Sequence, residues 1–337
     1  VTLTGFQPDS INSVCMAFGD FGRNENESQK KLNAISNHFY HSGKNLSCGS
    51  ELTPPYRTRL LLPILIGVAS LFKPWWAVCI PSILIYFAIG FLYAKFVSKL
   101  KPKANLGTQL FLLIPFLSPH IGWFLANIMT EGPLLLILLL MLNILVRSPM
   151  KATKSELPIF LLLGNAALFT KQSWPMVAVM FYTYFEKRKF FSKTVAAILS
   201  VLGCFTASEL VKIVGSSIYG SDFGNWNDFS LFAHPLRALK GVELGLSHDL
   251  FNLAKFGDVF GFIGIGFSLY LLLFGKLTAT NRLILATSFL WGLATVGTAY
   301  IADGSFGQNW RFFVFATFLA FPMWFNQKLS SSSLVEN

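Results

Sequence analysis

The chain has 337 residues, of which 53% are hydrophobic and 13% are charged, and its mean hydropathy is +0.54. Soluble domains carry about 25% charged residues, so the composition excludes an ordinary soluble protein and predicts an integral membrane protein. The formal net charge is +11. Proteins that bind nucleic acid are also basic, but here the basic residues gather between apolar stretches, which argues against a nucleic-acid partner.

Apolar stretches follow one another along the chain and predict an all-α, polytopic fold with about 9–10 transmembrane helices. They lie at 60–72, 75–94, 107–127, 132–146, 157–170, 174–185, 194–211, 257–275, 283–301 and 311–325. A span needs roughly 20 residues, so the shortest stretches are expected to borrow flanking residues. The stretches are continuous rather than alternating in polarity, which favours helices over membrane strands.

Fourteen of the 27 basic residues fall in alternate loops between these stretches. They are Lys95, Lys99, Lys101, Lys103, Arg147, Lys151, Lys154, Lys187, Arg188, Lys189, Lys193, Lys276, Arg282 and Lys328. The positive-inside rule places these loops in the cytoplasm. The opposite, outer side then holds 128–131, 171–173, 213–256 and 302–310.

These assignments divide the chain into three parts. Residues 1–56 form a polar N-terminal segment, residues 57–327 a multi-span domain with an outer loop at 213–256, and residues 328–337 a cytoplasmic tail. If the stretch 60–72, broken by Pro63, is only a partial span, residues 1–56 are non-cytoplasmic; if it spans fully, they are cytoplasmic. We expect the non-cytoplasmic arrangement.

The four cysteines have no metal-ligand spacing. Cys79 and Cys204 lie in apolar runs and are expected to be small core residues. Cys15 and Cys48 share the polar segment and can pair only in an oxidising compartment.

Several catalytic motifs are missing from the sequence. It holds no GxxxxGK[ST] loop, no HExxH and no GxSxG, which argues against ATP hydrolysis, zinc proteolysis and serine esterase chemistry. Gly261, Gly264 and Gly266 lie inside a span and predict close helix packing.

Charged groups at the outer ends of spans are the candidate functional residues. Arg57 and Arg59 flank an apolar helix, and arginine matches phosphate oxygens with two hydrogen bonds; interfacial anchoring is the alternative. Glu131 follows a stretch broken by proline and glycine, and it could orient a sugar hydroxyl or a metal; the alternative is a solvated loop acid. Lys171 lies on the side that is poor in positive charge, which an anionic ligand would explain; the alternative is snorkelling to the interface.

Two further outer positions are candidates. The loop at 216–256 mixes aromatic and acidic residues, Trp226 among them, as carbohydrate sites do, although an amphipathic interfacial segment would look similar. Arg311 opens the last span and could face a phosphate or diphosphate, with anchoring as the alternative.

The order of these motifs resembles the membrane glycosyltransferases of the GT-C superfamily, and most closely the bacterial relatives of the GPI-pathway mannosyltransferase (PIG-V type) family. The likeness rests on short motifs taken in order: Pro55-Tyr56-Arg57 to Pro63, then Pro119, Phe124, Thr130 and Glu131, then Thr170-Lys171-Gln172, and finally Arg311. The resemblance implies a GT-C-like fold and transfer of a sugar from a polyprenyl-phosphate donor to an acceptor hydroxyl on the non-cytoplasmic side. It also implies residence in a bilayer, the bacterial inner membrane being the expected one.

The implied mechanism is an inverting displacement. Cationic and polar groups would bind the donor: Arg57, Arg59, Lys171, Gln172 and Arg311, with Trp226 as an aromatic contact. An outer carboxylate would take the acceptor proton. The family's catalytic acid is usually an Asp just after the first helix; here Asp20, Glu25 and Glu27 compete for that role, beside Glu131. Some relatives use a divalent metal, so a metal cofactor stays open.

Two other functions compete with this hypothesis. A transporter or flippase would place its charged groups near the membrane midplane, and a non-catalytic subunit of a membrane complex would need no catalytic acid. The outer positions of Glu131 and Lys171, together with the 213–256 loop, favour the enzyme.

Overall fold

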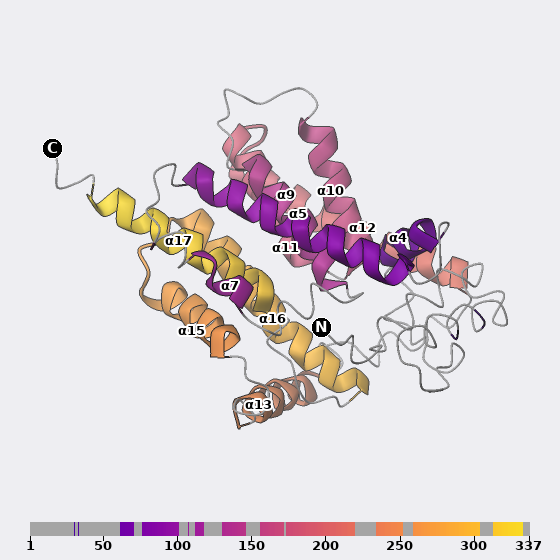
Figure 1. The fold of residues 1–337 in the computed structure, drawn as a ribbon. Helices are drawn as coiled ribbons and strands as arrows, with labels where there is room; N and C mark the ends of the chain where they lie inside the picture. Colours follow the sequence, from indigo (N-terminus) through magenta and orange to yellow (C-terminus); the bar gives the residue numbers. More distant parts are fainter. Residues whose placement is uncertain are drawn as a thin grey trace.

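The computed structural model describes residues 30, 33, 61–70, 76–100, 107, 112–117, 130–145, 156–171, 173–219, 234–251, 259–303 and 313–332. Its regular elements in these ranges are eleven helices (Figure 1), which confirms the all-α prediction. They are α4 (Leu61–Ser70), α5 (Trp76–Leu100), α7 (Ile114–Leu117), α9 (Glu131–Leu145), α10 (Glu156–Thr170), α11 (Trp174–Arg188), α12 (Lys193–Tyr219), α13 (Pro235–Phe251), α15 (Val259–Phe274), α16 (Ala279–Asp303) and α17 (Val314–Ser332).

Nine of the ten predicted apolar stretches correspond to one of these helices. The tenth, 107–127, contains the short α7, and most of it lies outside the described residues. Within the described ranges, two helical segments are long and apolar enough to cross a membrane, Ile80–Ser98 of α5 and Lys193–Val214 of α12. Four shorter helical segments are also apolar: Glu131–Leu145, Glu156–Thr170, Val259–Phe274 and Val314–Trp324.

Helices α9, α10 and α11 pack as one unit in which α10 runs antiparallel to both α9 and α11. The residue after the end of α10, Lys171, contacts the first residue of α9, Glu131. At the opposite end, the last residue of α11, Arg188, contacts the first residue of α10, Glu156. We call the end at Glu131 the glutamate end and the end at Arg188 the basic end.

The basic end carries a further link between α9 and α11. The Lys187 ammonium donates a hydrogen bond to the carbonyl of Leu145, the last residue of α9. A cation there complements the partial negative charge of a helix C-terminus. In the same region, Asn143 of α9 donates to the backbone carbonyl of Leu92 in α5 at 3.2 Å, so α9 is fixed to α5 by a polar contact as well as by apolar packing.

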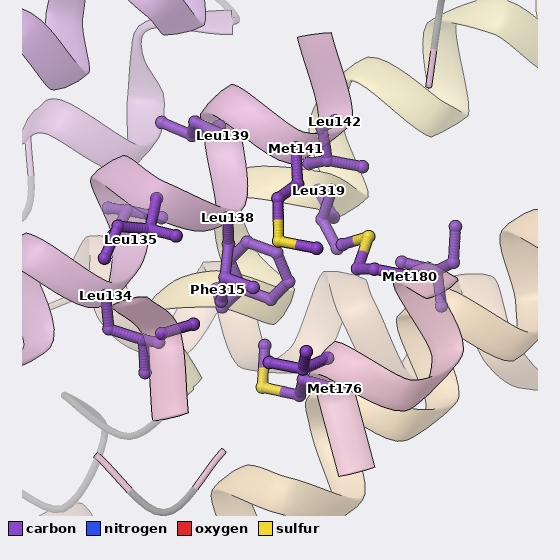
Figure 2. Packing of buried hydrophobic residues seen from close by; sticks show 14 of the residues in the cluster. Leu134, Leu135, Leu138, Leu139, Met141, Leu142, Met176, Met180, Phe315 and Leu319 are labelled. Atoms are coloured by element: carbon purple, nitrogen blue, oxygen red, sulfur yellow. The ribbon is translucent and has the colours of Figure 1, made fainter. Parts of the chain in front are cut away.

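Helix α17 lies among the other helices, buried on every side over residues 313–323. A helix that is apolar all round is a core helix or a membrane span. Figure 2 shows Phe315 and Leu319 of α17 packed between Leu138 and Met141 of α9 and the methionines of α11. The core therefore joins the α9–α11 unit to the C-terminal helices.

Much of the helix surface is apolar as well. Helix α12 exposes large hydrophobic side chains along its length: Val195, Ile198, Leu199, Val201, Leu202, Phe205, Leu210 and Ile213. Helix α5 does the same with Ile83, Leu84, Phe87 and Phe91, whose exposed fractions reach 69%. Contiguous apolar surface of this kind marks contact with a membrane or a partner protein.

The predicted outer loop at 213–256 is not a loop throughout. Helix α12 continues to Tyr219, and α13 follows at Pro235–Phe251. Helix α13 packs closely on α16: an added Cβ on Gly297 of α16 would lie 3.0 Å from the carbonyl oxygen of Ala238, and one on Gly241 would lie 2.5 Å from the Cβ of Tyr300. Small residues thus form the contact face of α13.

The glycine and cysteine predictions have mixed outcomes. Close packing is confirmed at Gly264, where an added Cβ would collide with the Thr317 side chain, and is wrong at Gly266, where it would meet nothing within 4 Å. Cys204 is a core residue as predicted, 5% exposed. The side chain of Cys79, and Cys15 and Cys48 altogether, lie outside the described residues.

Candidate functional site

Glu131 is held at the start of α9. The helix begins Glu131-Gly132-Pro133, and proline is favoured in a first turn because the amide it lacks would have no partner inside the helix. An acid in a first turn is stabilised by the positive end of the helix dipole. Glu131 is 3% exposed, so the alternative of a solvated loop acid is wrong.

Lys171 follows the last residue of α10. Its backbone N–H still bonds to the Ala167 carbonyl at 3.1 Å, which continues the helical turn, and the negative end of the helix dipole favours a cation at this place. The Lys171 Nζ lies 2.7 Å from Glu131 Oε1, and both side chains are buried, 7% and 2% exposed. Lys171 therefore does not snorkel to the surface, and the ion pair joins two motifs that lie 40 residues apart.

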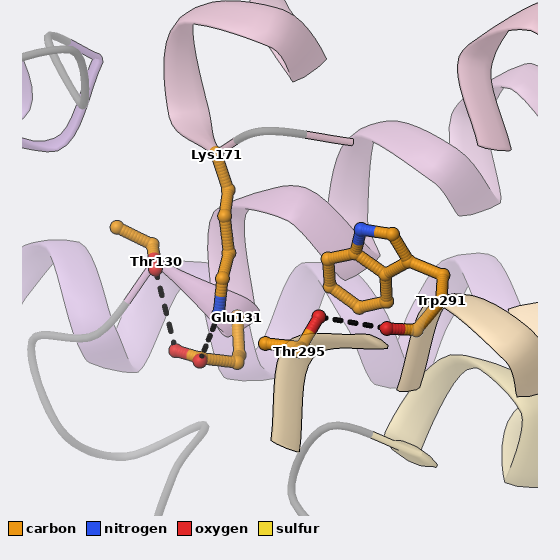
Figure 3. Close-up of polar contacts among 5 residues, drawn as sticks. All are labelled: Thr130, Glu131, Lys171, Trp291 and Thr295. Carbon is orange, nitrogen blue, oxygen red and sulfur yellow. Dashed lines mark hydrogen bonds and ion pairs between the residues drawn. The ribbon is translucent and has the colours of Figure 1, made fainter. Parts of the chain in front are cut away.

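Trp291 of α16 lies beside the Lys171 ammonium. Its ring centroid is 5.6 Å from the Lys171 Nζ, a distance at which the ring face attracts a cation. Figure 3 shows Lys171 extended down to the Glu131 carboxylate, with the Trp291 ring nearby. Sequence reasoning did not single out Trp291, because a tryptophan inside an apolar span carries no signal of its own.

Hydroxyl groups complete the surroundings of the ion pair. Thr130 Oγ1 donates to Glu131 Oε2 at 3.4 Å, and Thr130 is 1% exposed. Thr170 and Ser173 flank Lys171 in the sequence and are fully buried, with their hydroxyls donating to the backbone carbonyls of Ala166 at 2.7 Å and Ala167 at 3.3 Å. A buried pair loses much hydration, and the hydrogen bond from Thr130 to Glu131 offsets part of that cost. The result is a fixed cation and its counter-ion at a junction of α9, α10 and α16.

A second buried ion pair lies at the basic end. Arg188 Nη2 is 2.7 Å from Glu156 Oε2, with side chains 5% and 3% exposed, and the Arg188 guanidinium lies 5.7 Å from the Tyr184 ring centroid. Burial, and next the charge of Arg188, lower the pKa of the neighbouring Lys187 ammonium below its ordinary value. The sequence showed Arg188 only as one of a basic cluster, and it gave no reason to choose Glu156.

The remaining predicted site residues lie outside the described residues, so their proximity to Glu131 and Lys171 stays a prediction. They are Asp20, Glu25, Glu27, Arg57, Arg59, Gln172, Trp226 and Arg311. Among the described residues there is no group of three or more His, Cys, Asp or Glu side chains that could hold a metal ion.

Comparison with known proteins adds no relative to this description. No family model, no curated protein and no solved structure matches the chain.

Proposed function

We propose that the chain is a polytopic membrane glycosyltransferase that moves a sugar from a polyprenyl-phosphate donor to an acceptor hydroxyl on the non-cytoplasmic side of the membrane. The proposal rests on the sequence resemblance to the GT-C superfamily. The observation that carries it is the contact between Glu131 and Lys171, which belong to two separate motifs of that resemblance and meet 2.7 Å apart in one buried site.

The position of the pair supports an enzyme over a transporter. Both residues lie at helix ends, Glu131 at the start of α9 and Lys171 just beyond α10, whereas coupling groups of transporters lie near the midplane of broken helices. The basic end lies at the other end of the same three helices, and its cations favour the cytoplasmic side. The glutamate end is then the non-cytoplasmic one, where a lipid-phosphate donor would be used.

The membrane location itself is supported by the surface of the helices. Helices α5 and α12 each contain a segment long and apolar enough to span, and both expose large hydrophobic side chains. Among the other predicted spans, α16 has 25 residues and α17 has 19, whereas α4, α9, α10, α11 and α15 have 10 to 16. We propose that the shorter ones cross with flanking residues, giving the 9–10 spans expected from the sequence.

In the proposed mechanism the acceptor oxygen attacks C1 of the sugar as the bond from C1 to the phosphate oxygen breaks. Negative charge grows on the departing polyprenyl phosphate, and a fixed cation such as Lys171 stabilises it. The Glu131 carboxylate, already bound to Lys171, positions that ammonium. The acceptor proton passes to an outer carboxylate, for which Asp20, Glu25 and Glu27 are the candidates beside Glu131.

The test uses the full chain reconstituted in vesicles with radiolabelled polyprenyl-phosphate mannose and a bacterial membrane extract as the acceptor source. We expect wild-type protein to release polyprenyl phosphate and label an acceptor. Glu131→Gln and Lys171→Gln should each lower the rate about 10²-fold or more, the scale of losing one stabilising group at a developing charge.

The chain supplies a matched control at the basic end. Glu156→Gln also breaks a buried 2.7 Å ion pair, so it should cost similar stability but leave most of the transfer rate of the folded protein. Equal loss of transfer in Glu131→Gln and Glu156→Gln would show that both pairs act through folding alone. Wild-type protein that moves the lipid across the vesicle without transferring the sugar would overturn the enzyme in favour of a flippase.

A further inference from the structure

The turn between α11 and α12 is short and fixed at both ends. Lys189 N–H bonds to the Glu186 carbonyl at 3.1 Å and Phe190 N–H to the Phe185 carbonyl at 3.2 Å, the pair of bonds that closes a Schellman motif. Ser192 accepts from Ala196 N–H through its carbonyl at 2.8 Å, so α12 begins directly after it. The turn therefore holds its side chains in a defined arrangement.

Lys189 occupies the left-handed region with φ 55°. Glycine is the usual residue at this position of a Schellman motif, because a Cβ is strained there. A strained non-glycine residue that is kept in place invites a functional explanation. The Lys189 side chain is exposed and has no ion pair with the described part of the chain.

Two aromatic side chains project beside this lysine. Phe190 is 50% exposed and Phe191 is 45% exposed, while the ring of Phe191 packs edge-on against Phe185, with centroids 5.5 Å apart. The rings are thus supported from within and open outward. Their apolar surface continues along α12 into Val195 and Ile198, which are also exposed.

The cations near the turn differ in what they contact. Arg188 forms an ion pair with Glu156, and Lys187 donates a hydrogen bond to the Leu145 carbonyl. Lys193 touches Glu186 at 3.1 Å, yet its side chain is 78% exposed. Lys189 and Lys193 therefore stand at the surface on either side of Phe190 and Phe191.

We propose that these four residues, Lys189, Phe190, Phe191 and Lys193, form a docking surface for the headgroup layer of anionic phospholipids. The two rings enter the boundary between headgroups and acyl chains, where amphipathic and aromatic groups bind, and the two ammonium groups contact lipid phosphates. Lipid is favoured over a protein partner because the two exposed rings are followed along the chain by the exposed apolar side chains of α12, whose segment Lys193–Val214 is long enough to span. The inference rests on the membrane location proposed above and is independent of the sugar-transfer chemistry.

The experiment measures the thermal unfolding midpoint of the full chain in detergent while phosphatidylglycerol or phosphatidylcholine is added. Wild-type protein should be stabilised by phosphatidylglycerol at a lower concentration than by phosphatidylcholine. A lysine near an anionic lipid surface contributes about 1 kcal/mol, so removing Lys189 should raise the phosphatidylglycerol concentration needed for half the shift about fivefold.

The variant Lys189→Gly distinguishes an effect on lipid binding from an effect on protein stability, because the two are expected to change in opposite directions. Glycine relieves the strain of the left-handed position, so this variant should melt higher than wild type without lipid and yet respond less to phosphatidylglycerol. Lys212→Gln is the matched charge control. It removes one cation from the far part of α12, beside Glu209, and should keep the wild-type response.

Three results would overturn the proposal. They are equal stabilisation of wild type by both lipids, an unchanged phosphatidylglycerol response in Lys189→Gly, and equal loss of response in Lys189→Gly and Lys212→Gln. A chain that is active in sugar transfer but fails here would refute only the docking surface. A chain that passes here but transfers no sugar would refute only the enzyme.

Discussion

Replacing Gly241 by alanine should separate α13 from α16. An added Cβ would lie 2.5, 2.6 and 2.7 Å from the Cβ, Cγ and Cδ1 of Tyr300, whereas carbon atoms pack best at about 3.5–4.0 Å. The nearest atom is a Cβ fixed to the α16 backbone, so a change of rotamer cannot relieve the contact. The two helices would have to move apart by about 1 Å, and overpacking of this kind costs about 1–3 kcal/mol.

Gly266→Ala is the matched control for this change. Gly266 also lies inside a helix, α15, but an added Cβ there would meet nothing within 4 Å. Both substitutions gain about 1 kcal/mol of helix propensity, so that gain cancels when the variants are compared. The free energy of unfolding should therefore be about 1–3 kcal/mol lower for Gly241→Ala than for Gly266→Ala.

Denaturant unfolding of the full chain, followed by helical circular dichroism, gives this difference, and hydrogen exchange shows where it arises. The amides of α13 should exchange faster in Gly241→Ala, while those of α9 should keep their protection. Adding Tyr300→Ala should not rescue the variant, because alanine keeps the Cβ that collides. Gly241→Ala at least as stable as Gly266→Ala, with α13 still protected, would refute the close approach of the two helices.

Other consequences of the structure can be measured in the same unfolding assay. Glu131→Gln should lower the free energy of unfolding by about 3–5 kcal/mol, because it leaves the buried Lys171 ammonium without its carboxylate. The double change Glu131→Leu with Lys171→Met should recover most of that lost stability. A double variant no more stable than Glu131→Gln would contradict the explanation. Asn143→Ala should lower the free energy of unfolding by about 1–3 kcal/mol, because Asn143 donates hydrogen bonds to the Leu92 carbonyl at 3.2 Å and to the Leu139 carbonyl at 3.0 Å. A stability within error of wild type would show that α5 and α9 are held together by apolar packing alone. Gly203→Ala, at an open position of α12, should be neutral or raise stability by about 0.5–1 kcal/mol, and a clear loss would mean that this face of α12 is covered.

The helix pattern was predictable because continuous apolar runs determine it. Of the three shortest runs, 174–185 is extended in the structure, where α11 continues to Arg188, while α9 and α10 stay within one residue of the predicted length. Helix α13 was missed because its contact face is built from small residues such as Ala238 and Gly241, and glycine lowers helix propensity. Only packing on α16, which lies about 50 residues further along the chain, makes those small residues favourable.

The candidate site was predictable only in part. A charge on the wrong side of the topology drew attention to Lys171, and helix-breaking residues did the same for Glu131. That the two residues pair could not be read from either motif, because the contact depends on α10 running antiparallel to α9. Trp291 could not be predicted for a similar reason, because its contact is with the Lys171 ammonium, which lies at the end of a different helix, α10.

The central place of α17 has a consequence for how the chain is made. Helix α17 follows every other described helix in the sequence, so the ribosome synthesises it after them, yet it packs on α15 and α16, and its Phe315 and Leu319 lie against residues of α9 and α11 (Figure 2). Until it is inserted, the faces of Leu138, Met141 and Met180 lack their native neighbours. The core therefore cannot be completed before α17 has been made and inserted, and chains truncated before residue 313 should be retained by the cell's quality-control machinery rather than accumulate as partly finished protein.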